Sequence, residues 1–292
     1  MTAAEPATRQ SAPLQWSVNN LRLAGLSWGS PGEKPLLALH GWLDNAASFT
    51  ALAPLLEGYH VVALDLTGHG QSDWRSADAG YQIWDDLPEI LGVVDQLGWE
   101  RFDLVGHSRG AIISMLLSAS CPERVSRLVM LDALSPPPVP EADFPAQLRK
   151  ALDDKPRMME RDKRIYPSIE EAASVRLEGN ILPEAGLQLV RRNLCDCEGG
   201  VAWTTDPRLR GASAVKLTQG QVAACLGALA MPTLLLIASA SGRGIPQVAE
   251  QARQYIKDLV IETVTGGHDF HMEQEVPALA ARVLDFLAGG QP

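Results

Sequence analysis

The sequence of 292 residues predicts a doubly wound, mostly parallel α/β sheet with an inserted helical cap. Three observations support this fold class. Short, almost wholly apolar runs recur along the chain, which is typical of strands covered on both faces. Helix-like segments separate these runs, as right-handed crossovers require. The alternation stops over residues 134–228 and resumes afterwards. This stretch is rich in charge and contains "SPPPVPEADFP" near its start.

The N-terminal part contains a lead-in and a hairpin. Residues 1–13 lack the apolar core of a secretory signal, and we expect them to be disordered. Residues 14–28, "LQWSVNNLRLAGLSW", alternate apolar and polar positions around Asn19-Asn20, which is a turn signal. This pattern predicts an antiparallel hairpin at one edge of the sheet.

The remaining elements follow in strand and helix alternation. The expected strands are residues 35–41, 59–66, 102–107, 125–134, 232–240 and 259–264, and the expected helices are residues 46–56, 84–98, 110–120, 246–256 and 276–289. Because the last two strands need the first sheet as a partner, we expect one core domain with an insertion. The core is residues 14–133 and 229–292, and the helical cap is residues 134–228.

Composition limits the function classes. The chain is 46% hydrophobic and 21% charged, and its formal charge of −10 argues against nucleic-acid binding or a polybasic membrane anchor. No apolar stretch reaches the length of a membrane span. The four cysteines are scattered, which favours reduced residues in a cytoplasmic protein. A small-molecule substrate is the expected partner, and the sequence leaves the oligomeric state open.

The segment "GHSRG", residues 106–110, lies between an apolar strand and an apolar helix. Gly-x-Ser-x-Gly in this context is typical of a nucleophile elbow, in which Ser108 occupies a strained turn at the carboxyl end of a strand. Gly106 and Gly110 remove side chains that would clash with the neighbouring strand and helix. Ser108 is therefore the candidate nucleophile.

A serine needs a base, and the chain has six histidines. His268 follows the last expected strand in "TVTGGHDFHME", a loop that returns to the edge carrying Ser108. It is the candidate base. His271, next to the final helix, favours a structural role. A metal site from His268 and His271 lacks further ligands, so no metal is expected.

Four motifs carry a family resemblance: "LHGW" (39–42), "DLTGHGQSD" (65–73), "GHSRG" (106–110) and "GGHDFH" (266–271). Over about residues 14–290 the chain resembles the α/β-hydrolase superfamily, and its opening "HGWLDNAASF" and several cap stretches resemble the serine hydrolase-like proteins. The resemblance implies no cofactor. It implies an oxyanion hole from the backbone N–H groups of Trp42 and Arg109. His40 and Gly41 would support the turn before Trp42, and His40, Gly41 and His107 would lie at the substrate. His69 resembles a structural residue of the family.

The orienting acid departs from the family pattern. In that family it usually follows the strand after the cap, where this chain reads "LLLIASASGRGIP" (234–246) without Asp or Glu. The family's second position for the acid is the end of the strand before the cap, and Asp132 occupies it here. Competing interpretations are Ser241 standing in for the acid, or a catalytically weak protein. Asp269 and Asp44 are less suitable.

These residues predict a serine hydrolase of esterase type, acting through Ser108, His268 and Asp132 on a small, apolar ester. The serine argues against the haloalkane dehalogenases and epoxide hydrolases of this fold, which need a carboxylate nucleophile. Thioester, lactone, carbon–carbon and perhydrolase chemistry stay open. The alternative is a ligand-binding or signalling protein on a hydrolase scaffold with vestigial turnover.

Overall fold

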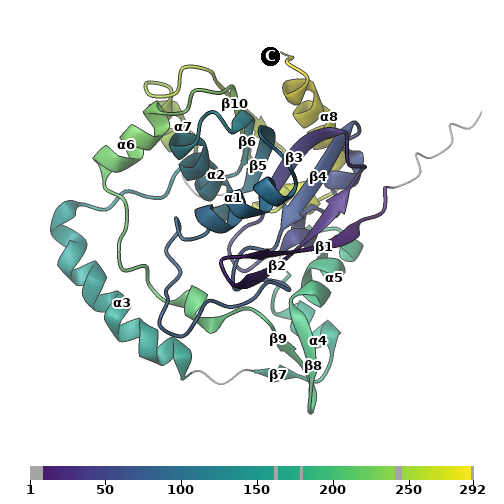
Figure 1. The fold of residues 1–292 in the computed structure, drawn as a ribbon, viewed down its shortest axis with the longest axis vertical. Helices are drawn as coiled ribbons and strands as arrows, with labels where there is room; N and C mark the ends of the chain where they lie inside the picture. Colours follow the sequence, from purple (N-terminus) through teal and green to yellow (C-terminus); the bar gives the residue numbers. More distant parts are fainter. Residues whose placement is uncertain (1–8, 161–163, 178–179, 241–244, 291–292) are drawn as a thin grey trace, which may run out of the picture.

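The computed structural model describes residues 9–160, 164–177, 180–240 and 245–290. Eight strands form its central sheet: β1 (Ala12–Val18), β2 (Leu21–Trp28), β3 (Lys34–Leu39), β4 (Tyr59–Leu64), β5 (Phe102–His107), β6 (Val125–Leu131), β10 (Thr233–Ala238) and β11 (Leu259–Val264). Their order across the sheet is β1-β2-β4-β3-β5-β6-β10-β11 (Figure 1). All neighbours pair in parallel except β1 with β2 and β2 with β4. The predicted mostly parallel α/β sheet is confirmed.

The N-terminal hairpin forms as predicted. Asn19 and Asn20 both adopt positive φ, 51° and 62°, which a two-residue turn between twisted strands requires. Residues 9–13, part of the expected disordered lead-in, are ordered instead. Arg9 donates to the carbonyl of Leu56 and pairs with Glu33, and β1 already begins at Ala12. Residues 1–8 lie outside the described residues.

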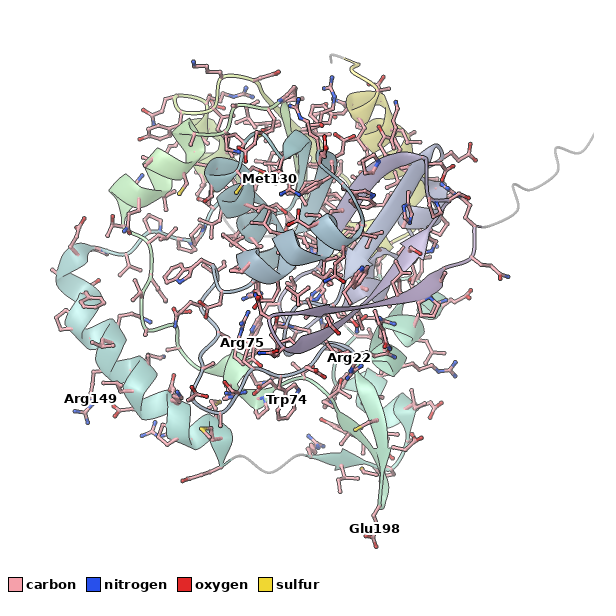
Figure 2. All side chains as sticks on the ribbon, viewed as in Figure 1. Arg22, Trp74, Arg75, Met130, Arg149 and Glu198 are labelled. Carbon is pink, nitrogen blue, oxygen red and sulfur yellow. The ribbon has the colours of Figure 1, made fainter. Side chains whose placement is uncertain are left out.

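Helices cover both faces of the sheet. One face packs against α1 (Leu87–Gln96), α2 (Arg109–Ser120), α6 (Gln219–Gly227) and α7 (Ile245–Ala252), and the other packs against α8 (Val276–Leu287) and the 3₁₀ helices η1 (Ala46–Phe49) and η2 (Ala53–Leu55). Figure 2 shows Met130, which is fully buried, inside these layers. Among the described helices, none combines the length and apolar character needed to cross a membrane.

The expected helix over residues 46–56 is wrong in detail. It consists of the two short 3₁₀ helices η1 and η2, separated around Thr50. Pro54 lacks the N–H that a continuous α-helix would need there, and its ring disfavours helical backbone at the preceding residue. The segment still buries Ala46, Ala47 and Phe49 against the sheet.

The segment between β6 and β10 is not wholly helical. Besides η3 (Glu141–Asp143), α3 (Phe144–Met159), α4 (Ile169–Ser174), α5 (Pro183–Arg192) and η4 (Pro207–Arg210), it contains β7 (Ile165–Tyr166), β8 (Leu194–Cys197) and β9 (Gly200–Trp203). These strands form a second, antiparallel sheet in the order β7-β9-β8. Gly199 and Gly200 adopt positive φ and allow the tight turn between β8 and β9. Strands of two to four residues are too short to show a periodicity in sequence.

Helix α6 lies in the predicted cap by sequence but belongs to the core by packing. Its Val222 and Leu226 are buried in the same apolar cluster as Met115 of α2. By contrast, α3 buries none of its residues and runs along the outside of the molecule (Figure 1). Arg149 of α3 points outward, as Figure 2 shows. The part of the insertion that stands off the core therefore ends before α6.

Polar contacts attach the inserted segment to loops at the carboxyl ends of the strands. Arg192 forms an ion pair of 2.9 Å with the fully buried carboxylate of Asp65. The Tyr81 hydroxyl donates to Asp206 over 2.7 Å, and the Asn193 amide donates to the carbonyl of Leu43 over 3.1 Å. Because such buried hydrogen bonds need defined partners, they fix the insertion over this edge of the sheet.

Asp103 in β5 is a buried carboxylate whose side chain is poorly paired. Its residue is 8% exposed, and its Oδ1 has no hydrogen-bond partner within the described chain. Burial raises the pKa of Asp103 to about 6, although Arg127 and Lys34 act to lower it. At pH 8 the folded protein therefore carries a desolvated charge that the unfolded chain keeps in water.

We expect Asp103→Asn to raise the free energy of unfolding at pH 8 by up to about 3 kcal/mol. The pKa of Asp103 in the folded protein lies about two units above its value in the unfolded chain, and the variant has no charge to desolvate. The folded pKa exceeds the unfolded one, so wild type regains this stability as pH falls through 6 toward 4. Urea unfolding at pH 8 and pH 4.5 should show a gain at the first pH that falls to about a third of that size at the second. Asp95→Asn, on the surface, is the control. An equal gain at both pH values would contradict the argument.

Candidate active site

Ser108 lies on the turn between β5 and α2. Its φ of 51° and ψ of −115° are strained for a residue with a side chain, and its N–H donates to the carbonyl of Leu131 over 3.0 Å. Space around the turn is minimal: a Cβ added to Gly106 would lie 2.5 Å from the carbonyl oxygen of Gly110. The two glycines therefore permit the turn, as the sequence predicted.

Ser108, His268 and Asp132 form one hydrogen-bonded chain. His268 Nε2 lies 2.9 Å from Ser108 Oγ, and His268 Nδ1 lies 2.6 Å from Asp132 Oδ2. A carboxylate only accepts, so Nδ1–H donates to Asp132 and leaves Nε2 free to accept from the serine hydroxyl. The structure brings together the three residues that the sequence selected, although they come from three separate loops.

Asp132 is held firmly. It is fully buried at the end of β6, with φ of 50°, and its Oδ1 accepts a hydrogen bond of 2.9 Å from the N–H of Ala238. Ala238 ends β10, the strand after which the family usually places its acid. No sequence pattern indicates this backbone donor, because it arises only from the β6–β10 pairing.

His107 is a support for His268 rather than a substrate contact. Its Nε2–H donates to the carbonyl of His268 over 2.9 Å, and the residue is 1% exposed. Burial first, and then the neighbouring His268, lower the pKa of His107 to about 4, so it is neutral at pH 7. Its predicted place at the substrate is therefore wrong. The side chain lies under the His268 loop because β5 is covered at that point.

His40 and Gly41 are also not at the substrate. His40 is fully buried, its Nδ1–H donates to the carbonyl of Gly41 over 2.7 Å, and its Nε2 accepts from the N–H of Leu66. Burial lowers its pKa to about 3. Gly41 is buried against Asp44 and His107, whose atoms a Cβ would approach to about 3 Å. Both residues shape the turn that carries Trp42.

Trp42 and Arg109 have backbone N–H groups with no acceptor among the described residues. Arg109 is the first residue of α2, where an N–H has no partner within the helix and the helix dipole favours negative charge. The side chains are used elsewhere. The Trp42 indole donates to the carbonyl of Leu209 over 3.0 Å, and Arg109 forms an ion pair of 2.9 Å with Asp86.

The other residues weighed from the sequence lie off this chain of hydrogen bonds. His271 is buried with its Nε2 2.7 Å from Ser48 Oγ, and His69 is buried against the carbonyl of Thr67. Asp44 pairs with Arg176, and burial raises its pKa to about 6. Asp269 approaches His107, with 3.8 Å between Oδ1 and Nε2. Ser241 and Arg243 lie outside the described residues.

Comparisons with known proteins agree on the family. A family model described as the alpha/beta hydrolase fold matches residues 34–165. A serine hydrolase-like protein of Dictyostelium discoideum is 30% identical over 286 residues, which cover 91% of this chain and 78% of that protein. This chain belongs to the α/β-hydrolase superfamily. It is also similar to a serine hydrolase-like protein of Danio rerio, at 29% identity over 77% of this chain and 70% of that one.

Two solved structures are similar to this α/β-hydrolase over nearly its whole length. A hypothetical protein of Pseudomonas aeruginosa PAO1 superposes with a TM-score of 0.89 at 36% identity, covering 94% of this chain and 99% of that chain. A thioesterase domain from the curacin biosynthetic pathway superposes with a TM-score of 0.81 at 27% identity, again covering 94% and 99%. Both span the core and the inserted segment.

One group of side chains in this α/β-hydrolase has the composition of a metal site. His107, Asp269 and His271 each place a ligand atom within 4.8 Å of the other two, the only such group in the described chain. The two imidazole rings are tilted against each other, with centroids 4.1 Å apart and 38° between their planes. Each ring uses its Nε2 in a hydrogen bond, His107 to the carbonyl of His268 and His271 to Ser48 Oγ.

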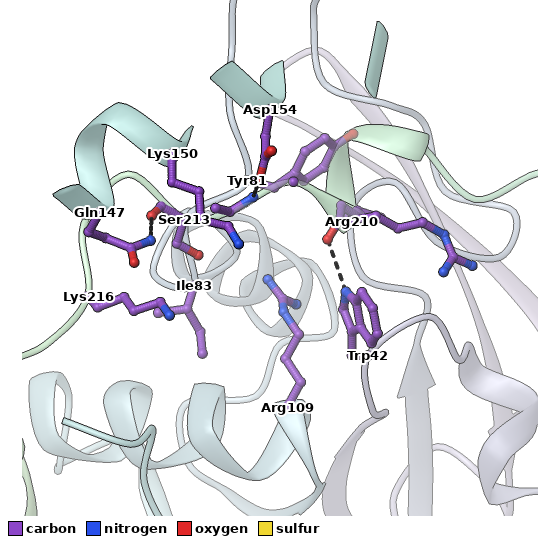
Figure 3. Close-up of a pocket in the computed structure, with 13 residues that line it drawn as sticks. Trp42, Tyr81, Ile83, Arg109, Gln147, Lys150, Asp154, Arg210, Ser213 and Lys216 are labelled. Atoms are coloured by element: carbon purple, nitrogen blue, oxygen red, sulfur yellow. Dashed lines mark hydrogen bonds between the residues drawn. The ribbon is translucent and has the colours of Figure 1, made fainter. Parts of the chain in front are cut away.

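A cavity of about 460 Å³ reaches Arg109, which follows Ser108 in the sequence (Figure 3). Trp42 lines it from the core, Gln147 and Lys150 line it from α3, and Ser213 and Lys216 line it from the segment after η4. The lining is largely polar and charged, because the exposed, charge-rich helix α3 contributes to the wall. The run "LRKALDDKPR" within α3 was the available signal.

Proposed function

We propose that this α/β-hydrolase is a serine hydrolase of esterase type, with Ser108 as nucleophile, His268 as base and Asp132 as orienting acid. The observation that carries the proposal is the hydrogen-bonded chain from the buried Asp132 through His268 to a serine on a strained turn. Base and nucleophile at hydrogen-bond distance, with the base oriented by a third group, is the arrangement that activates a serine.

The reaction follows from this arrangement. Ser108 Oγ attacks the acyl carbonyl while His268 Nε2 takes its proton, and Asp132 stabilises the resulting imidazolium. The N–H groups of Trp42 and Arg109 donate to the oxyanion. The carbon–oxygen bond to the alcohol then breaks, and His268 returns the proton to that oxygen. A water molecule next attacks the acyl-enzyme with His268 again as base, which releases the carboxylic acid and restores Ser108.

The free N–H groups support this assignment of the oxyanion hole. Each lacks a protein acceptor in the described part of the chain, so both are free to donate to an oxyanion. One such donor contributes on the order of 3 kcal/mol to lowering the barrier. By the same steps, Ser108, His268 and Asp132 would cleave a thioester. One of the structurally similar proteins is a thioesterase domain.

The binding-protein alternative depended on the missing acid after β10. With Asp132 in contact with His268, no observation favours that alternative over the hydrolase. The two differ in one respect that is simple to measure: only an activated serine reacts rapidly with a fluorophosphonate.

We expect a fluorophosphonate probe to form one adduct per chain, on the peptide that contains Ser108, as intact-mass and peptide mass spectrometry would show. Ser108→Ala should not be labelled, whereas Ser239→Ala, at the end of β10, should be labelled like wild type. The folded protein should also release p-nitrophenol from short p-nitrophenyl esters. A folded wild-type protein that neither reacts with the probe nor turns over these esters would refute the proposal in favour of a binding protein.

A further inference from the structure

The cavity at Arg109 carries an excess of positive charge in an acidic protein. Lys150 and Lys216 line it, and neither forms an ion pair with any described residue. Figure 3 shows both ammonium groups directed toward the middle of the cavity, from α3 above and from the segment after η4. The acidic lining residue Asp154 already accepts a hydrogen bond from the N–H of Ala212. The whole chain, by contrast, has a formal charge of −10.

Arg109 adds a third donor deeper in the same cavity. Its side chain is only 13% exposed, and its Nη2 donates to Asp86 over 2.9 Å. Its Nη1 is buried and has no partner in the part of the chain that the structure describes. Figure 3 shows the guanidinium rising into the cavity between Lys216 and Trp42. A buried guanidinium N–H without an acceptor is costly, and an anionic group in the cavity would satisfy it.

Packing does not account for the two lysines. Helix α3 buries none of its residues, so Lys150 is not held there by the core. The helix is attached to the segment below it by hydrogen bonds from Gln147 to the carbonyl of Ser213 and from the N–H of Ala212 to Asp154. These contacts enclose the cavity and place cations from two separate segments over the residue next to Ser108.

We propose that the substrate carries an anionic group, a carboxylate or a phosphate, at some distance from its reacting carbonyl, and that Lys150, Lys216 and Arg109 bind it. This inference rests on the proposed function, because it places the reacting carbonyl at Ser108. The anion sits on the acyl chain if it is a carboxylate of a dicarboxylic acid, and on the leaving group if it is a phosphate of a thiol such as coenzyme A. Such a substrate differs from the small apolar ester that the sequence predicted.

Two matched pairs of substrates test the proposal and separate these sources. The first pair is mono-p-nitrophenyl adipate and its neutral methyl ester. The second pair is acetyl-coenzyme A and neutral S-acetyl-N-acetylcysteamine. For one of the pairs, we expect wild-type kcat/KM to be about tenfold higher for the anionic member, since charge-assisted hydrogen bonds are the strong ones. The pair that shows the ratio identifies the position of the anion.

Neutralising the lysines should remove this preference. In Lys150→Gln/Lys216→Gln the ratio should fall to within about twofold of one, and in wild type it should fall when NaCl rises from 50 to 500 mM. Lys257→Gln, an exposed lysine between α7 and β11, is the control and should keep the wild-type ratio. Ratios near one for both pairs in wild type, or a ratio unchanged in the double variant, would overturn the inference.

Binding measured without turnover distinguishes this failure from failure of the proposed function. In calorimetry, Ser108→Ala should bind mono-p-nitrophenyl adipate or acetyl-coenzyme A more tightly than the neutral compound of the same pair. The variant Ser108→Ala/Lys150→Gln/Lys216→Gln should bind both compounds of each pair about equally. Turnover of neutral esters with no charge preference refutes only the anion site. Absence of fluorophosphonate labelling refutes the hydrolase itself, and charge-dependent binding in that case would still support the anion site.

Discussion

Asp132→Asn is expected to lower kcat for ester hydrolysis about 10⁴-fold while changing KM little. Asp132 receives the Nδ1–H of His268 over 2.6 Å and is itself anchored by the N–H of Ala238. In the variant the amide oxygen can keep the bond from Ala238, which turns the amide NH₂ toward His268. His268 Nδ1 must then accept, its proton moves to Nε2, and Nε2 can no longer take the proton of Ser108.

The asparagine variant isolates this effect from folding. Asp132 adopts a φ of 50°, and asparagine is among the residues that tolerate positive φ best. It also has nearly the same shape as aspartate, so the buried site keeps its volume. Rates with p-nitrophenyl acetate and with a fluorophosphonate should both fall, whereas the circular dichroism spectrum and the urea midpoint should stay near those of wild type.

Asp269→Asn is the matched control, because Asp269 is adjacent to His268 in sequence but forms no hydrogen bond with it. We expect its kcat to stay within a few-fold of wild type. If Asp132→Asn kept activity within tenfold of wild type, another group would have to orient His268, and the assignment of the acid would be wrong.

The residues of the hydrogen-bonded chain could be selected from sequence because each ends a recognisable strand. Ser108 follows β5, Asp132 follows β6 and His268 follows β11, and parallel strands bring their carboxyl ends to one edge. That the acid is not at the family's usual place could also be seen in the sequence, because neither Asp nor Glu follows directly after β10. The backbone donor that fixes Asp132 was not visible, because it depends on register.

The roles of His40 and His107 could not be read from sequence in the same way. Both stand in motifs next to Ser108 and Trp42, and the family resemblance placed both at the substrate. Burial decides otherwise: both are almost fully enclosed, bond to backbone carbonyls and have lowered pKa values. The cavity lining depends on how α3 stands over the core, and periodicity within α3 does not contain that information.

Gly110→Ala is expected to destabilise the protein by about 3 kcal/mol or more and to lower ester hydrolysis more than 100-fold. A Cβ at Gly110 would lie 2.0 Å from the carbonyl oxygen of Leu39, 2.5 Å from its carbonyl carbon and 2.7 Å from the carbonyl oxygen of His40. All three are backbone atoms at the end of β3, so no side chain can rotate away. Either α2 or the end of β3 must move.

Such a movement separates the two N–H groups that we propose as oxyanion donors, because Arg109 begins α2 and Trp42 follows β3. An error of about 1 Å in positioning can cost on the order of 10²-fold in rate, so activity should fall even in the molecules that stay folded. Urea unfolding gives the stability, and kcat per labelled active site separates loss of fold from loss of positioning.

Gly227→Ala in α6 is the control, because nothing lies within 4 Å of the position of its Cβ. Alanine favours helix over glycine by about 1 kcal/mol, so this variant should be as stable as wild type or more stable. A Gly110→Ala protein with wild-type stability and full activity would show that the contact between α2 and β3 is looser than the structure has it, and the elbow would then not depend on its second glycine.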